Sequence, residues 1–261
     1  MYFSSVFQEK GLESRLGRIR ADNNIRRMMR ILERKRAFYH DHWHLSLAKK
    51  YWLGKLFERR IGKELEKLRN DPLPDIRVQK SLISGSFTDK TCRIYFVIRG
   101  HKESPYNGGY YIGWIQLYEK FPFVPPDIGV CVKNGRFKKG RRICLSLTSY
   151  HKETWSPSNS LSTVLLSFQS FWLDDKEGRP DTYGAVDARK AAKKRNLTVE
   201  EYRRKFARDS VTNSLNRTIL GSKFQEYLKL TDDDRQVEDN GGIISEERLR
   251  ELTTDAFERL F

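Results

Sequence analysis

One cysteine of this chain lies where it could act as a nucleophile. Cys144 stands near the end of a glycine-punctuated loop that opens with Asn134-Gly135 and carries Lys138-Lys139 and Arg141-Arg142. Cations close to a cysteine favour the thiolate, which is its nucleophilic form. A lone cysteine is equally a common small buried hydrophobic residue. The loop therefore predicts either a nucleophile or a core residue, and the surrounding elements must distinguish the two.

The other two cysteines, Cys92 and Cys131, fall in segments with strand-like patterns and are expected to be structural. Three cysteines form no metal-ligand spacing, and an odd number argues against a disulfide framework, which favours a reducing compartment. His40, His42 and His44 scatter around a helix, so they predict no metal site. We expect neither a metal nor another cofactor.

The composition favours anionic partners. The 261 residues include 50 lysines and arginines against 34 aspartates and glutamates, a formal net charge of +16. A surface of this charge attracts nucleic acid, acidic membrane or an acidic protein face. The N-terminus lacks the layout of a signal peptide, and no apolar run approaches the roughly 18 to 20 residues that span a bilayer. We expect a soluble cytoplasmic or nuclear protein, in a host cell if the source is viral or a symbiont.

The first part of the chain predicts a basic arm, a helix and a sheet. Residues 1–50 are helix-prone, with an apolar stripe from Ile25 to Leu32 among arginines. This arm is either packed on the following domain or free to bind an acidic partner or nucleic acid. A helix is expected from Tyr51 to Arg69, ended by the prolines that follow. Strands are then expected over residues 76–83, 92–99, 110–117 and 128–132.

Helices follow the cysteine loop. Ser160 is expected to cap a helix through Trp172 that buries a broad apolar face against the sheet. Thr198 and Glu201 form a capping box that opens a basic helix through about Leu215. Further helical segments are expected over 223–230 and 245–261. This order indicates an α+β fold, in which a four-stranded antiparallel meander follows an N-terminal helix and precedes C-terminal helices, with helical extensions at both ends. The expected parts are 1–50, 51–230 and 231–261, the last an acidic linker with an amphipathic helix.

Four segments in this order resemble one family. They are Lys63–Pro72 at the end of the first helix, Ser104–Tyr111 in a hairpin, the proline-rich Phe121–Ile128, and Asn134–Pro157 around the cysteine. The chain resembles the ubiquitin-conjugating enzymes over about residues 52 to 230. The match is closest to their J-type subfamily, whose usual members serve endoplasmic-reticulum-associated degradation. The resemblance implies the fold of that family and identifies residues 51–230 as its catalytic domain.

The resemblance implies a transferase with a thioester intermediate at Cys144. The family receives ubiquitin from an ATP-dependent activating enzyme and passes it to a substrate lysine or hydroxyl, with a ligase. A thiolate suits this task because it is both a good nucleophile and a good leaving group. Asn134 falls on the family's active-site asparagine, which donates to the developing oxyanion or braces the loop. It could also serve only as the turn residue before Gly135. Val132 and Lys133 depart from the histidine and proline of the family's usual triplet.

Other site residues follow by the same resemblance. His151 is similar in position to the histidine of the J-type pattern, where it would accept a proton or brace the loop. The family's acidic residue beyond the buried helix falls near Arg179 and stays unassigned. Phe123, Pro157 and Ser158 correspond to ligase-binding positions, although Phe123 could instead pack in the core.

The alternatives keep the fold but change the function. One is a catalytically inactive variant that binds ubiquitin without carrying it, and another is a basic scaffold or nucleic-acid-associated protein. Transfer of a ubiquitin-like modifier is a third. J-type members normally end in a membrane anchor, whereas this chain ends in Phe257–Phe261 with none expected.

Overall fold

The computed structural model describes residues 42–79, 87–88, 91–174, 177–225, 227, 236 and 245–261. The chain divides into two compact units, Met1–Gly54 and Lys55–Phe261. The predicted apolar stripe from Ile25 to Leu32 and the acidic residues 232–234 lie outside the described residues. The helix over residues 42–70 crosses the boundary between the two units, and the other elements discussed below lie in the second unit.

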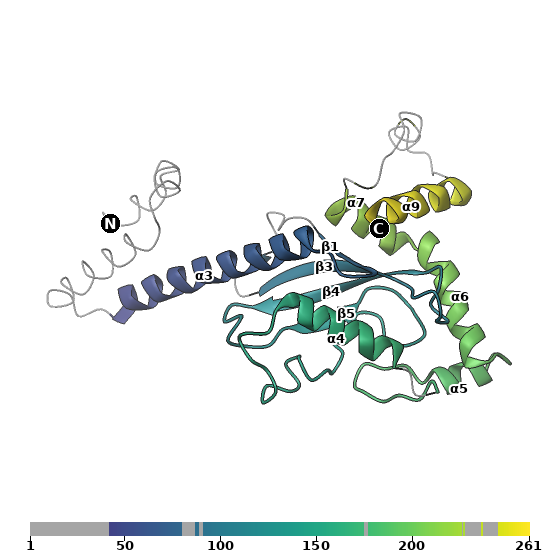
Figure 1. The fold of residues 1–261 in the computed structure, drawn as a ribbon, viewed down its shortest axis with the longest axis horizontal. Coiled ribbons are helices and arrows are strands. Elements are labelled where there is room, and N and C mark those ends of the chain that lie inside the picture. The colour runs from purple at the N-terminus through teal and green to yellow at the C-terminus, as the bar shows by residue number, and fades with distance from the viewer. Residues whose placement is uncertain are drawn as a thin grey trace. The chain divides into compact units, whose positions relative to one another are not determined.

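An antiparallel sheet forms the centre of the second unit (Figure 1). Its strands are β1 (Ile76–Val78), β3 (Thr91–Arg99), β4 (Tyr110–Tyr118) and β5 (Asp127–Val130), and neighbours along the chain are neighbours in the sheet. This order confirms the predicted four-stranded meander. A short additional strand, β2 (Phe87–Thr88), pairs with the start of β3.

Two helices cover the apolar face of the sheet. Alternate residues of β3, including Phe96, are buried, as the period of two in a strand requires. The Phe96 ring meets Phe168 of α4 (Leu161–Leu173) edge to face at 5.9 Å, and Figure 1 shows α4 running along the sheet. Helix α3 (His42–Asn70), already helical before the predicted Tyr51, buries Ile61 among other apolar residues of its Lys55–Asn70 part. These contacts form one core.

A buried carboxylate fastens α3 to the start of α4. Glu64 accepts a hydrogen bond from the backbone N–H of Leu161 at 2.9 Å and another from Arg60 at 2.8 Å. Ser160 accepts from the N–H of Thr163, which confirms the predicted cap. Since the first N–H groups of a helix have no partner within the helix, these acceptors determine where α4 begins.

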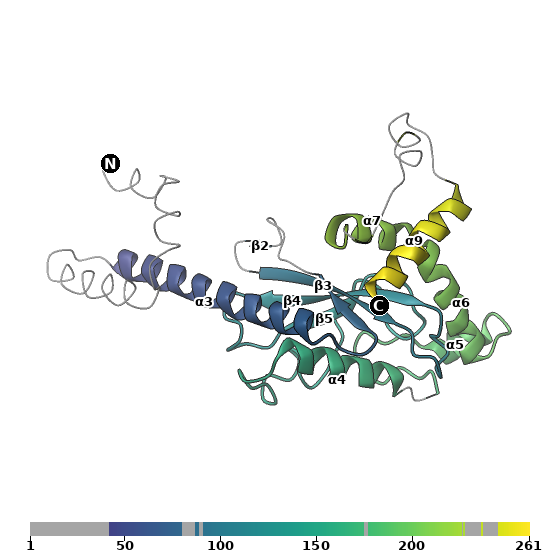
Figure 2. The ribbon, with the colours of Figure 1, turned by 45° about the horizontal axis from the view of Figure 1, so that its top comes forward.

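Further helices follow α4 in the chain. They are α5 (Ala188–Lys193), α6 (Val199–Thr212), α7 (Ser214–Lys223) and α9 (Glu246–Leu260). Helix α9 contacts α6 (Figure 2), and its Phe257 ring stacks on Tyr110 of β4 at 4.3 Å. Phe261 then lies against the guanidinium of Arg99, the cross-strand neighbour of Tyr110. The predicted helix over 245–261 is confirmed.

The bounds predicted from the sequence were wrong for two helical segments. The helix predicted through Leu215 ends at Thr212, because the side chain of Asn213 accepts from the N–H groups of Leu215 and Asn216 and starts a new helix. The segment predicted to begin at Lys223 is instead the end of that helix, and the described residues Phe224, Gln225 and Tyr227 are not helical.

Truncation of Phe257 tests the packing of α9. Because this side chain is fully buried and stacked, Phe257→Ala should lower the free energy of unfolding by about 3–5 kcal/mol. The exposed Arg250 on the same helix provides a control, and Arg250→Ala should change it by less than about 0.5 kcal/mol. Denaturant titration measures both. A Phe257→Ala effect as small as the control would contradict the packing.

Candidate active site

Cys144 is the one cysteine of the chain that is not buried. Cys92 and Cys131 lie in the core, and Cys144 is half-buried. Burial raises the pKa of the Cys92 thiol to about 12 and that of Cys131 to about 11. Both therefore stay protonated near neutral pH, where only the thiolate is a strong nucleophile. Of the three, Cys144 alone combines access with a reactive setting.

The backbone around Cys144 is held on two sides. Its N–H donates to the carbonyl of Tyr183 at 3.2 Å, and its carbonyl accepts from the hydroxyl of Thr182 at 2.7 Å. The preceding Ile143 donates to the carbonyl of Ile128 in β5 at 3.0 Å. The cysteine thus lies between the sheet edge and the segment that follows α4.

The imidazole of His151 faces the sulfur of Cys144. Its Nε2 lies 3.1 Å from the Sγ, and its Nδ1 lies 3.1 Å from the Oε1 of Glu153. A bond of Glu153 to its own backbone, followed by the interaction with His151, lowers the pKa of this carboxyl from its ordinary value. An ionised Glu153 favours a proton on Nδ1, which leaves the lone pair of Nε2 facing the thiol.

Sequence reasoning selected His151 but missed Glu153. The available signal was a carboxylate two residues after a histidine, within the same loop as the cysteine. In a short loop, side chains two residues apart can come into contact, although no helix or strand periodicity requires this contact. Backbone turns bring His151 and Glu153 together. The N–H of His151 donates to the carbonyl of Thr148, and the carbonyl of His151 accepts from Thr154.

Asn134 is buried with its amide fully used inside its own loop. Its Nδ2 donates to the carbonyls of Val132 at 3.0 Å and Phe137 at 3.3 Å. Its Oδ1 accepts from the N–H groups of Arg136 and Phe137, both at 2.8 Å. These four bonds use every donor and acceptor site that a primary amide has. In this geometry the side-chain amide of Asn134 braces its own loop.

A buried ion pair joins this loop to the segment after α4. The guanidinium of Arg136 binds both oxygens of Asp181, at 2.7 and 2.6 Å, and the rings of Phe137 and Phe171 lie beside it. Asp181 is therefore engaged in the structure and is not directed at an incoming substrate. Arg179, at the position where the family often has an acid, lies 3.9 Å from Glu177.

Asp127 anchors the residues on either side of Cys144. This buried carboxylate accepts from Arg142 at 3.2 Å and also from the hydroxyls of Ser149 and Tyr118. Burial and the bond to Asp127 raise the pKa of Tyr118 to about 12, and the same carboxylate raises the pKa of Arg142. The chain before and after the cysteine is thereby tied to one point on β5.

The predicted ligase-binding residues lie on two adjoining loops. Phe123 is 64% exposed, so it does not pack in the core, and Pro157 and Ser158 are exposed as well. The indole N–H of Trp155 donates to the carbonyl of Pro122 at 2.8 Å, which holds the two loops together.

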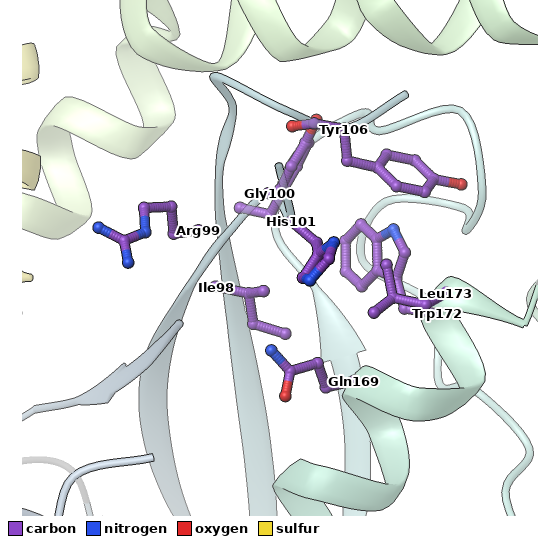
Figure 3. Close-up of a pocket in the computed structure, with 9 residues that line it drawn as sticks. Ile98, Arg99, Gly100, His101, Tyr106, Gln169, Trp172 and Leu173 are labelled. Atoms are coloured by element: carbon purple, nitrogen blue, oxygen red, sulfur yellow. The ribbon is translucent and has the colours of Figure 1, made fainter. Parts of the chain in front are cut away.

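Neither of two cavities found in the described part of the chain includes Cys144. A narrow cavity of about 10 Å³ lies beside Tyr106, Gln169 and Trp172, around which Figure 3 shows the lining side chains. An open hollow of about 700 Å³ lies between the β3–β4 connection and α6. Cys144 itself is half-buried.

Removal of the Asn134 amide tests its bracing role. Asn134→Ala leaves two buried N–H donors without their acceptor, so the free energy of unfolding should fall by about 2–4 kcal/mol. The exposed Asn107 is the control, for which Asn107→Ala should cost less than about 0.5 kcal/mol. Equal effects in denaturant titration would contradict the bracing role.

Comparison with known proteins identifies the family. The family model for ubiquitin-conjugating enzymes matches residues 60–208. The chain is 29% identical over 171 residues to a ubiquitin-conjugating enzyme E2 J2 of Bos taurus, covering 66% of this chain and 58% of that protein. It is 33% identical over 142 residues to E2 J2 of Homo sapiens, covering 54% and 51%. It is 36% identical over 141 residues to a ubiquitin-conjugating enzyme E2 6 of Kluyveromyces lactis, covering 52% of each.

The chain thus spans about half the length of the curated relatives it matches. Within the described residues, no helix combines the length and apolarity that crossing a lipid bilayer requires. The predicted J-type resemblance is confirmed by the E2 J2 relatives. The match covers the sheet, α4 and the cysteine loop together. The chain belongs to the ubiquitin-conjugating enzyme family.

Proposed function

We propose that the protein accepts ubiquitin as a thioester on Cys144 and transfers it to a lysine or hydroxyl of a substrate, with a ligase. The observation that carries this proposal is the 3.1 Å contact between the Cys144 sulfur and the His151 imidazole, whose other nitrogen faces Glu153. A thiol beside an oriented base is the arrangement that activates a nucleophile.

Charging is an exchange of one thioester for another. The Cys144 thiol gives its proton to Nε2 of His151, and the thiolate attacks the ubiquitin carbonyl held on the activating enzyme. The new carbon–sulfur bond forms as the old one breaks, and the cysteine of the activating enzyme leaves as a thiolate. The proton on His151 then passes to that thiolate or to solvent, which restores the neutral imidazole for the transfer step. The ordered backbone of residues 143–145 keeps the sulfur in place for this attack.

Transfer consumes the thioester. The amine or hydroxyl of the substrate attacks the carbonyl, the carbon–sulfur bond breaks, and Cys144 leaves as a thiolate. The proton lost by the attacking group passes to His151, which Glu153 orients through Nδ1. Asn134 acts at a distance by bracing the loop, since its amide has no donor left for the oxyanion.

The partners follow from the proposed activity. They are ubiquitin, its activating enzyme, a ligase and a protein substrate. The exposed Phe123, with Pro157 and Ser158 on the adjoining loop, offers the ligase a contact surface. The binding of an acidic partner or nucleic acid by residues 1–50 stays a prediction. An inactive ubiquitin-binding variant is less well supported, because it would have no use for an accessible cysteine beside a histidine.

A charging assay with cysteine variants tests the proposal. Incubation with activating enzyme, ATP and ubiquitin should give an adduct that a reducing agent removes, and Cys144→Ala should abolish it. Cys131→Ala is the control, because this buried thiol takes no part in the reaction. No adduct in the wild type, or an adduct that persists in Cys144→Ala, would overturn the proposal.

Substitution of the base and its partner tests the transfer step. In single-turnover discharge onto lysine, His151→Gln should slow transfer by about 10²-fold, and Glu153→Gln by about 10-fold because it only orients the imidazole. Because the pKa of Glu153 is lowered, this carboxyl stays ionised at any pH above the ordinary pKa of a glutamate. The rate defect of Glu153→Gln should therefore be constant from about pH 6 to about pH 9 and should shrink only in acid.

The exposed Lys152 lies between these two residues in sequence and supplies the control. Lys152→Gln should discharge at the wild-type rate. A wild-type rate in His151→Gln would remove this residue from the transfer step while leaving the role of Cys144 intact.

A further inference from the structure

The sequence around Cys144 is free of acidic residues over a long stretch. Between Asp127 and Glu153 there is no aspartate or glutamate, whereas seven lysines and arginines occur. Arg136 is buried with Asp181, and Arg142 pairs with Asp127. The side chains of Lys138, Lys139 and Arg141 are exposed just before the cysteine. One flank of the site is therefore strongly positive.

A second run of cations is brought to the same place by the fold. Residues 189–195 contain five lysines and arginines and belong mostly to α5. The chain leading into α5 is hydrogen-bonded to the cysteine loop through the backbone. The N–H of Lys138 donates to the carbonyl of Gly184 at 2.7 Å, and the N–H of Val186 donates to the carbonyl of Arg136 at 2.9 Å. A bridge between Phe137 and Ala185 lies between these two bonds. The two basic runs thus adjoin.

Three of the acids near these cations have partners of their own. Asp181 binds Arg136, Glu177 lies near Arg179, and the carboxylate of Asp187 accepts from the backbone N–H of Lys190 as the cap of α5. Six exposed cationic side chains of these two runs form no ion pair within the described part of the chain. We name them the cationic rim: Lys138, Lys139, Arg141, Arg189, Lys190 and Lys193.

We propose that the cationic rim binds an acidic segment of the substrate polypeptide, so that acceptor residues flanked by aspartate or glutamate are preferred. This inference rests on the proposed function, because the nearest rim residue, Arg141, lies three residues before Cys144, where the thioester meets its acceptor. The occupant must carry the attacking amine or hydroxyl close to acidic side chains. A substrate polypeptide meets that requirement, because it places lysine or hydroxyl side chains next to acidic side chains and is the acceptor that the proposed function already requires.

Electrostatic attraction at this position should raise the rate of productive encounter. Exposed charges act over about 10 Å at moderate salt and are screened as salt rises. We therefore expect a preference for acidic acceptors of about tenfold at low ionic strength. It should fall towards unity at about 0.5 M salt, because the Debye length is then only a few ångströms.

The test compares two lysine peptides as acceptors for the charged protein. One has glutamates on both sides of the lysine and the other has serines. The readout is the ratio of their single-turnover discharge rates, so a general loss of activity does not imitate the result. The wild type should favour the acidic peptide, and the quadruple variant Lys138→Glu, Lys139→Glu, Lys190→Glu, Lys193→Glu should reverse the ratio. Equal rates in the wild type would overturn the inference.

The control reverses charge at other exposed positions. Lys102 and Arg208 lie on the β3–β4 connection and on α6, outside the rim. The double variant Lys102→Glu, Arg208→Glu should keep the preference for the acidic peptide. The milder rim variant Lys138→Gln, Lys190→Gln should keep a weaker preference for it. A preference lost equally in the Lys102 and Arg208 variant would show a general effect of net charge and would contradict a localised rim.

A binding measurement separates this inference from the proposed function. Fluorescence anisotropy of the labelled acidic peptide with uncharged protein requires no thioester, so it decides the role of the rim even if charging fails. The wild type should bind this peptide more tightly than the reversed variant does. Rim-dependent binding that is tighter for a single-stranded oligonucleotide or for phosphatidylserine vesicles would overturn the choice of a polypeptide.

Discussion

The arrangement around Cys144 depends on one buried ion pair. Arg136 is 1% exposed and binds Asp181 through both carboxylate oxygens, which joins the cysteine loop to the segment that follows α4. Because a bidentate pair is directional, it fixes orientation as well as distance. Loss of one partner would leave a charge buried and uncompensated, at a cost of about 3–5 kcal/mol.

The consequences of that pair extend to the site and its surroundings. With the segment in place, Thr182 and Tyr183 hold the backbone of Cys144 from one side. On the other side Asp127 ties down Arg142 and Ser149, which precede and follow the cysteine. The sulfur is thus positioned by its neighbours, while His151 and Glu153 remain open to solvent where a substrate can approach.

The sequence predicted the architecture well because its signals are local. Alternation in β3, the proline-ended α3 and the caps at Ser160 and Thr198 each specify an element from a few adjacent residues. The errors came from residues with two uses. Asn213 ends one helix and caps the next, so a continuous basic helix was predicted where two exist. The six-residue α5 was missed because it is too short to show a period.

The site was only partly predictable for a related reason. The setting of Cys144 follows from its loop, but the choice among three roles for Asn134 depends on where the carbonyls of Val132 and Phe137 point, which no sequence pattern states. Glu153 and Asp127 act through contacts that the folded loop creates. Family resemblance located His151, and the geometry supplied its two neighbours.

Identification of the residue that carries ubiquitin tests the central claim most directly. After incubation with activating enzyme, ATP and ubiquitin, mass spectrometry of the intact wild-type protein should show the gain of one ubiquitin, which a thiol reagent removes. Digestion in acid should then locate the modification on the peptide containing Cys144. A mass gain that resists the thiol reagent, or a modification located on a different residue, would contradict it.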